Sequence, residues 1–146
     1  MEELVKYISE KNMEKVHRYE NNFTEDLKRT DLDIDSKEEF YDFMVKNEYM
    51  LAAIDSLEEK IDELNNECES LNKKGEELDD VGKLDVADTC SSLDIEIEKL
   101  TKLRKDLMKK CKAMRFKASK IDKIVNKRIK IMDKKRNKEA SRFIKK

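Results

Sequence analysis

The sequence feature that most constrains the fold is a pair of heptad seams, in which apolar or small residues recur at alternating steps of three and four. The first seam consists of Ile54, Leu57, Ile61, Leu64, Cys68, Leu71, Gly75 and Leu78. The second consists of Val86, Cys90, Leu93, Ile97, Leu100, Arg104, Leu107, Cys111, Met114, Ala118, Ile121 and Val125. Such spacing keeps one stripe of a helix facing a partner helix along a left-handed supercoil. The pattern therefore predicts two long helices that pack against each other.

A single glycine, Gly82, separates the two seams, and a short connection makes consecutive helices antiparallel neighbours. The sequence therefore predicts an antiparallel coiled-coil hairpin with its tip near residues 79–84, where Gly82 is free to take a positive φ angle. In this register Leu64 lies opposite Leu100, and Leu71 lies opposite Leu93. The seams could also pair between two chains in a swapped dimer, and the sequence does not choose between these arrangements.

Composition supports an all-α fold. The 146 residues include no proline and only 2 glycines, which excludes a turn-rich β-sandwich, and 46% of them are charged, which leaves few residues for a large round core. We expect a small N-terminal helical segment (residues 1–53) packed at the base of the hairpin (residues 54–112), followed by a basic C-terminal helix or tail (residues 113–146). A partly disordered chain is an alternative, and residues beyond Ala118 are those most expected to fray.

The N-terminal third contains a polar break at residues 30–36, between two stretches with helical spacing. Ser36 is the expected N-cap of the helix that follows, and Glu39 completes a capping box. Phe40, Phe43 and Met44 then supply large apolar side chains, which are expected to pack at the base of the hairpin.

Charge is distributed very unevenly along the chain. Residues 31–100 carry 7 basic and 23 acidic side chains, whereas residues 101–146 carry 20 basic and 4 acidic ones. Asymmetry of this size indicates a polyanion partner for the basic end. The alternative is that the two parts neutralise each other when the hairpin brings them together.

The basic segment 109–130 is the predicted RNA-binding site, because its lysines and arginines extend past most of the acidic arm. Phe116 is the one aromatic side chain there, so base readout is expected to be poor and binding salt-sensitive. The predicted RNA-binding residues are Lys109, Lys110, Lys112, Arg115, Lys117, Lys120, Lys123, Lys127, Arg128 and Lys130.

Residues that carry catalytic or metal chemistry are scarce. His17 is the only histidine, so neither a histidine-based triad nor a metal face with two histidines can be built. The three cysteines (Cys68, Cys90 and Cys111) are too scattered for a disulfide framework and are expected to be reduced thiols. The sequence predicts no enzyme, no cofactor, no metal, no small-molecule substrate and no membrane partner.

The hairpin contains the run Ile61-Asp62-Glu63-Leu64-Asn65-Asn66-Glu67, followed by Leu71, Lys74, Glu76, Leu78, Gly82 and Asp85. With these intervals it resembles the coiled-coil hairpin of the Luc-seven-like family, splicing factors associated with the U1 small nuclear ribonucleoprotein. Upstream, Lys15-Val16-His17 is similar to the end of that family's first zinc finger, and Cys111 falls where its second finger begins. Met13 and Met114 stand at positions where the family has cysteines, so the resemblance implies a reduced member with degenerate, metal-free fingers.

The resemblance implies a non-catalytic subunit of a splicing ribonucleoprotein that supports recognition of the 5′ splice site by the U1 particle. Its partners would be U1 proteins and RNA, and its location the nucleus. The basic run Lys134-Lys135-Arg136-Asn137-Lys138 is a further, weak nuclear-import signal. The alternative function is a coiled-coil scaffold or tether with no RNA role.

Overall fold

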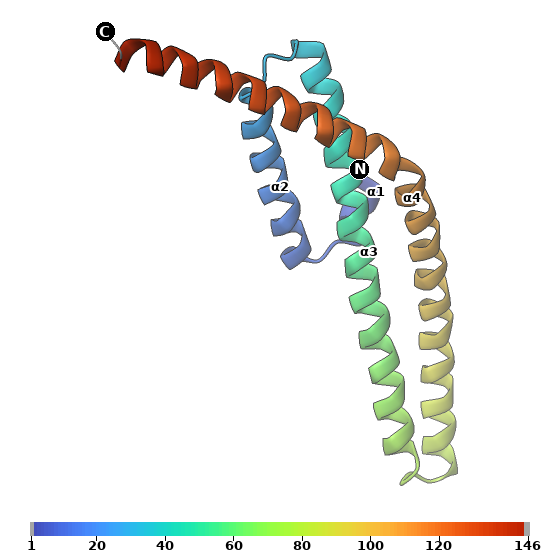
Figure 1. Ribbon diagram of the computed structural model, residues 1–146. Coiled ribbons are helices and arrows are strands. Elements are labelled where there is room, and N and C mark those ends of the chain that lie inside the picture. Colours follow the sequence, from blue (N-terminus) through green and yellow to red (C-terminus); the bar gives the residue numbers. More distant parts are fainter. Residues whose placement is uncertain (1, 145–146) are drawn as a thin grey trace.

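The computed structural model describes residues 2–144, with side chains up to Arg142. These residues form four helices and no strand: α1 (Glu2–Val5), α2 (Glu10–Lys28), α3 (Ile34–Gly75) and α4 (Asp80–Ile144). Helices α3 and α4 pack side by side as an antiparallel hairpin, and α1 and α2 pack at its base (Figure 1). The predicted all-α hairpin is confirmed. Within residues 2–144, the helices contain no segment long and apolar enough to span a membrane.

Helices α2 and α3 each begin at a side-chain cap. The Ser9 hydroxyl accepts a hydrogen bond from the Asn12 backbone N–H at 3.3 Å, and the Asp33 carboxylate accepts one from the Ser36 N–H, also at 3.3 Å. The expected cap at Ser36 is therefore wrong: Asp33 takes that role, and Ser36 supplies the amide that it caps. Helix α3 consequently starts at Ile34.

Helix α3 continues for 42 residues and α4 for 65, because the chain has no proline and both glycines lie at helix ends, Gly75 at the end of α3 and Gly82 in the first turn of α4. The expected boundaries at 53/54 and 112/113 therefore fall inside continuous helices. The predicted helical cluster around Phe40 and Phe43 is the first part of α3, and the basic C-terminal segment is the second part of α4.

The turn between α3 and α4 occupies residues 76–79, earlier than the tip expected at 79–84. No described residue, Gly82 included, has a positive φ angle, so that expectation is also wrong. Gly82 lies in the first turn of α4, where its N–H donates to the Asp79 carboxylate at 2.8 Å. A Cβ atom at residue 82 would lie 2.9 Å from the Leu78 Cβ. Gly82 is needed for a close approach between the turn and the helix, not for a left-handed conformation.

The hairpin register is shifted by one seam step from the expected one. Gly75 faces Val86, since a Cβ at residue 75 would lie 3.2 Å from the Val86 Cγ1, and Leu78 is left 45% exposed in the turn. The remaining seam positions, from Ile54 to Gly75 and from Val86 to Val125, are buried or half-buried as predicted. A shift by one seam step keeps both stripes in contact because the heptad repeats. The turn, not the repeat, therefore sets the register.

The buried core consists of two clusters along α3: a lower cluster nearer the tip of the hairpin and an upper cluster nearer the start of α3. In the lower cluster, Leu57 and Leu107 are 2% and 4% exposed, and Leu4, Tyr7 and Ile8 pack from the N-terminus. The upper cluster joins α2, α3 and α4 through Phe23, Leu27, Met44, Ala118, Ile121, Val125 and Ile129. Helix α4 bends so that its basic part crosses α3 and α2 at this cluster (Figure 1). Residues 118–129, where fraying is expected to begin, are helical, and α2 and α3 cover their buried side.

A buried polar contact holds the start of α2 against α3. The Asn12 side chain is 1% exposed, and its Nδ2 donates to the Ser56 hydroxyl at 2.7 Å. The Ser9 backbone N–H donates to the same hydroxyl at 2.9 Å. Because buried polar groups are stable only when they are hydrogen-bonded, these contacts fix where α2 meets α3.

The observed register makes Cys68 and Cys90 neighbours, since the Cys90 Sγ lies 3.8 Å from the Cys68 carbonyl oxygen. Dibromobimane, which links only adjacent thiols, should therefore join them within one chain, as peptide mapping by mass spectrometry would show. Cys90→Ser should abolish the product and Cys111→Ser should not. A monomer that yields no linked product would contradict this register.

Replacement of Leu57 by alanine should lower the free energy of unfolding by about 2–5 kcal/mol, because the side chain is almost fully buried between both long helices. The matched control Ile34→Ala, at a position 75% exposed at the start of α3, should change it by less than about 0.5 kcal/mol. Urea unfolding followed by circular dichroism measures both. Equal effects would show that the lower cluster is not the core.

Candidate nucleic-acid interface

The ten predicted RNA-binding residues all lie on α4, but the structure does not bring them together on one surface. Two of them are already paired within the chain, four lie on the side of α4 that faces away from the core, and three border a groove between α3 and α4. Lys110 is exposed and belongs to none of these groups.

Lys117 and Arg128 are engaged with acidic or aromatic side chains of the base. The Lys117 Nζ lies 3.9 Å from the Glu39 carboxylate and 4.7 Å from the centre of the Phe43 ring. The Arg128 guanidinium makes a two-point contact with Asp31, in which Nε donates to Oδ1 at 2.7 Å. This contact lowers the pKa of the Asp31 carboxyl. Both cations therefore help to fasten α4 to the base.

The side of α4 that faces away from the upper cluster carries Lys120, Lys123, Lys127 and Lys130, which we call the outer basic face. The four lysines are exposed and follow one another at steps of three and four, so they form a row about 15 Å long. No described carboxylate lies within ion-pair distance of these four ammonium groups. The row is held in place because Ile121 and Val125, on the opposite side of the helix, are each 2% exposed.

Phe116 lies one turn before this row and is 71% exposed. The Lys120 Nζ sits 4.7 Å from the centre of its ring. An exposed aromatic ring beside lysines offers one stacking surface for a base next to a row of phosphate contacts.

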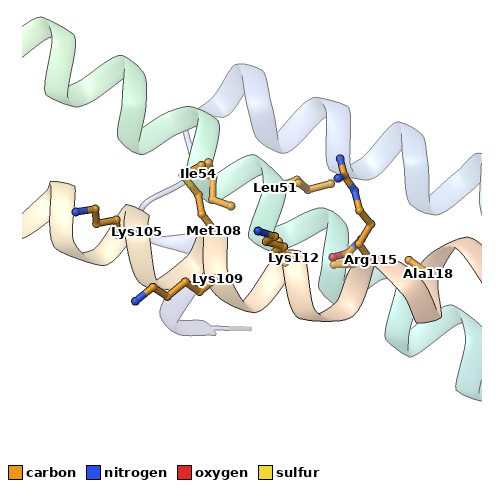
Figure 2. Close-up of a pocket in the computed structure, with 10 residues that line it drawn as sticks. Leu51, Ile54, Lys105, Met108, Lys109, Lys112, Arg115 and Ala118 are labelled. Carbon is orange, nitrogen blue, oxygen red and sulfur yellow. The ribbon is translucent and has the colours of Figure 1, made fainter.

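Lys109, Lys112 and Arg115 lie elsewhere, along a groove between α3 and α4 that also includes Lys105 (Figure 2). The groove has a volume of about 580 Å³, and its apolar lining includes Leu51, Ile54, Met108 and Ala118. We call it the basic groove. The Asn47 side-chain oxygen is buried beside it with no hydrogen-bond partner among the described residues. Sequence reasoning missed Lys105, although it lies four residues before Lys109 on the same helix.

Carboxylates of α2, α3 and α4 influence one another's pKa values at the base without forming a recognisable catalytic arrangement. The pKa of Glu48 is raised, mainly by burial and then by the charges of Asp122 and Asp55. Burial also raises the pKa of Asp122, with a contribution from Asp26. Among the described residues, no group of three or more His, Cys, Asp or Glu side chains could hold a metal ion. His17 and Cys111, the residues that match the zinc-finger pattern, lie on different helices, α2 and α4.

Comparison with protein-family models, with curated proteins and with solved structures finds no match for this chain. The surfaces described above are therefore the basis for assigning a function.

Replacement of Glu48 by glutamine should raise the melting temperature at pH 7. The raised pKa means that the folded protein holds this proton more tightly than the unfolded chain does. The stabilisation that comes from binding this proton is therefore complete below the unfolded carboxyl pKa, about 4.3. It is lost as pH rises through the pKa of the folded protein. The gain from Glu48→Gln should accordingly disappear near pH 4.

Thermal melts at both pH values measure this effect, and Glu59→Gln, at an exposed glutamate of the same helix, is the matched control. A melting temperature at pH 7 that is unchanged or lowered by Glu48→Gln would show that the charged carboxylate is not a destabilising group in the fold.

Proposed function

We propose that this chain is a non-catalytic RNA-binding subunit whose outer basic face contacts the phosphate backbone. The observation that carries this proposal is the row of four exposed lysines with no carboxylate partner among the described residues. Because like charges in a row repel one another, a polyanion that neutralises them is bound favourably. The release of counterions from the nucleic acid adds to this effect and makes affinity fall with salt.

The row offers little sequence readout. Lysines contact phosphates as point charges, and phosphate contacts position a nucleic acid without reading its bases. Phe116 adds one ring on which a base of any identity can stack. The bound RNA is therefore single-stranded and recognised with little sequence preference. Four phosphate contacts give a salt dependence with a logarithmic slope of about −3.

The finer proposal is that the subunit belongs to a splicing ribonucleoprotein in the nucleus, with U1 proteins and RNA as its partners. Support for it comes from the resemblance of Ile61–Glu67 and Lys15–His17 to the Luc-seven-like pattern. In this proposal the acidic arm of the hairpin contacts proteins while the basic half of α4 contacts RNA. Support of U1 recognition of the 5′ splice site would then be indirect, since the residues that match the two zinc fingers lack their partner ligands.

A scaffold or tether without an RNA role is the second candidate function. The observation that favours it is the long arm of the hairpin, which extends well beyond the base as a two-helix rod (Figure 1). Such a rod separates two binding partners at a fixed distance. Retention of RNA on the purified protein distinguishes this function from the first one, because a tether would retain none.

Charge reversal of Lys120, Lys123 and Lys127 to glutamate should weaken binding of a fluorescent single-stranded RNA by tenfold or more, about 1.4 kcal/mol, at low salt. The control reverses Lys60, Lys73 and Lys74, three exposed lysines of the acidic arm, and so changes the net charge equally. Fluorescence anisotropy measures the affinity, and circular dichroism verifies the fold.

If no RNA binding is detected at about 50 mM salt, or if both triple variants lose affinity equally, the outer basic face is not an RNA site. The same outcome would favour the tether function.

A further inference from the structure

The basic groove combines an apolar floor with cations on its border, and the described residues that line it include no carboxylate. Leu51 and Met108 remain 41% and 44% exposed there. Lys105, Lys109 and Lys112 are spaced at four and three residues, so they follow one flank of the groove for about two turns of α4. An occupant of this groove must offer apolar side chains flanked by negative charges.

The tip of the hairpin has that composition. Val81 and Leu84 are 68% and 64% exposed and lie three residues apart in the first turns of α4, so they form a small exposed apolar pair. Residues 76–88 around them contain one basic residue, Lys83, and six acidic ones: Glu76, Glu77, Asp79, Asp80, Asp85 and Asp88. The tip thus presents a small apolar surface with an acidic border, which is the complement of the basic groove.

The tip and the groove face the same side of the arm. Leu84, Lys105 and Lys112 are separated by multiples of seven residues, so they occupy the same heptad position of α4. A tip cannot reach the groove of its own chain, because 24 residues of continuous helix between Leu84 and Met108 hold them about 36 Å apart. Only another copy of the chain could therefore bring such a tip into the groove.

We propose that the occupant is a second copy of this chain, placed antiparallel so that the tip of each copy lies in the basic groove of the other. Such a contact is isologous, and each dimer contains it twice. The interface in this proposal is separate from the outer basic face, so it does not depend on the proposed RNA function.

The exposed residues of α4 define the register of this dimer. Val81, Asp88, Ile95, Lys102 and Lys109 recur at intervals of seven and form one row along the arm. A two-fold axis at Ile95 places Asp88 opposite Lys102 and Val81 opposite Lys109, each pair twice. Ile95 then meets its own copy on the axis, which accounts for an isoleucine that is 68% exposed among charged neighbours. The same register brings Leu84 beside Lys105, a border residue of the basic groove.

Sedimentation velocity of the full chain tests this dimer. At about 50 mM salt the 17.4 kDa chain should form a dimer that dissociates at about 500 mM salt, since the contacts are largely ionic. Asp88→Lys and Lys102→Asp should each raise the dissociation constant about tenfold or more. The double variant should restore it, because the swapped charges face each other again. Ile95→Glu should also weaken the dimer while leaving the helical circular dichroism unchanged.

A monomer at low salt and protein concentrations up to about 1 mM would overturn the proposal. A dimer that resists both Ile95→Glu and the single charge reversals would also overturn it, because the interface must then lie elsewhere, as in a swapped hairpin. RNA binding is measured separately on the same variants, and it should be unaffected by Ile95→Glu. Failure of this dimer is therefore distinguishable from failure of the proposed RNA function.

Discussion

The heptad seam between α3 and α4 is the contact on which the rest of the structure depends. It buries one stripe of each helix and leaves the remaining sides to charged residues, which a chain with 46% charged side chains requires. Near the tip the seam is thin, with half-buried residues such as Cys68, Leu71 and Cys90. Toward the base it becomes a true core, because Leu4 of α1 and Tyr7 and Ile8 of the following turn pack over Leu57 and Leu107. Stability is therefore concentrated at the base, and the arm depends on it.

The base also determines how the charges of α4 are displayed. Ion pairs from Arg128 to Asp31 and from Arg29 to Asp133, the latter at 2.8 Å, connect the α2–α3 loop to α4. They lie at the edge of the upper cluster and are exposed, so their energetic contribution is small, but they orient the helix. With Ile121 and Val125 buried against α2 and α3, the lysines of the outer basic face are forced outward. The outer basic face is thus a consequence of packing as well as of composition.

The sequence alone predicted the helical hairpin and nearly all of its seam, because heptad spacing is a strong signal over many turns. It did not predict the register, since a repeat that matches itself after one seam step cannot distinguish Val86 opposite Gly75 from Val86 opposite Leu78. That choice depends on the turn at residues 76–79 and on the close approach of Gly82 to Leu78. The docking of α4 residues beyond Ala118 onto α2 was missed because it depends on tertiary contacts. The cap at Asp33 was missed because Asp33 and Ser36 are both favourable N-cap residues, three positions apart. At the candidate site, the sequence identified the cations. It did not show which of them are paired within the chain, which face outward and which border the groove, because that follows from where α4 bends.

The central claim is that the basic half of α4 is a rigid helix held by α2 and α3, not a flexible cationic tail. Hydrogen exchange of the free protein, followed by mass spectrometry, tests this claim most directly. Backbone amides of residues 118–129 should exchange slowly, at rates close to those of the lower cluster around Leu57, because both are buried against neighbouring helices. Exchange of residues 118–129 as fast as that of an unfolded chain would contradict the account, since the lysines would then have no fixed arrangement.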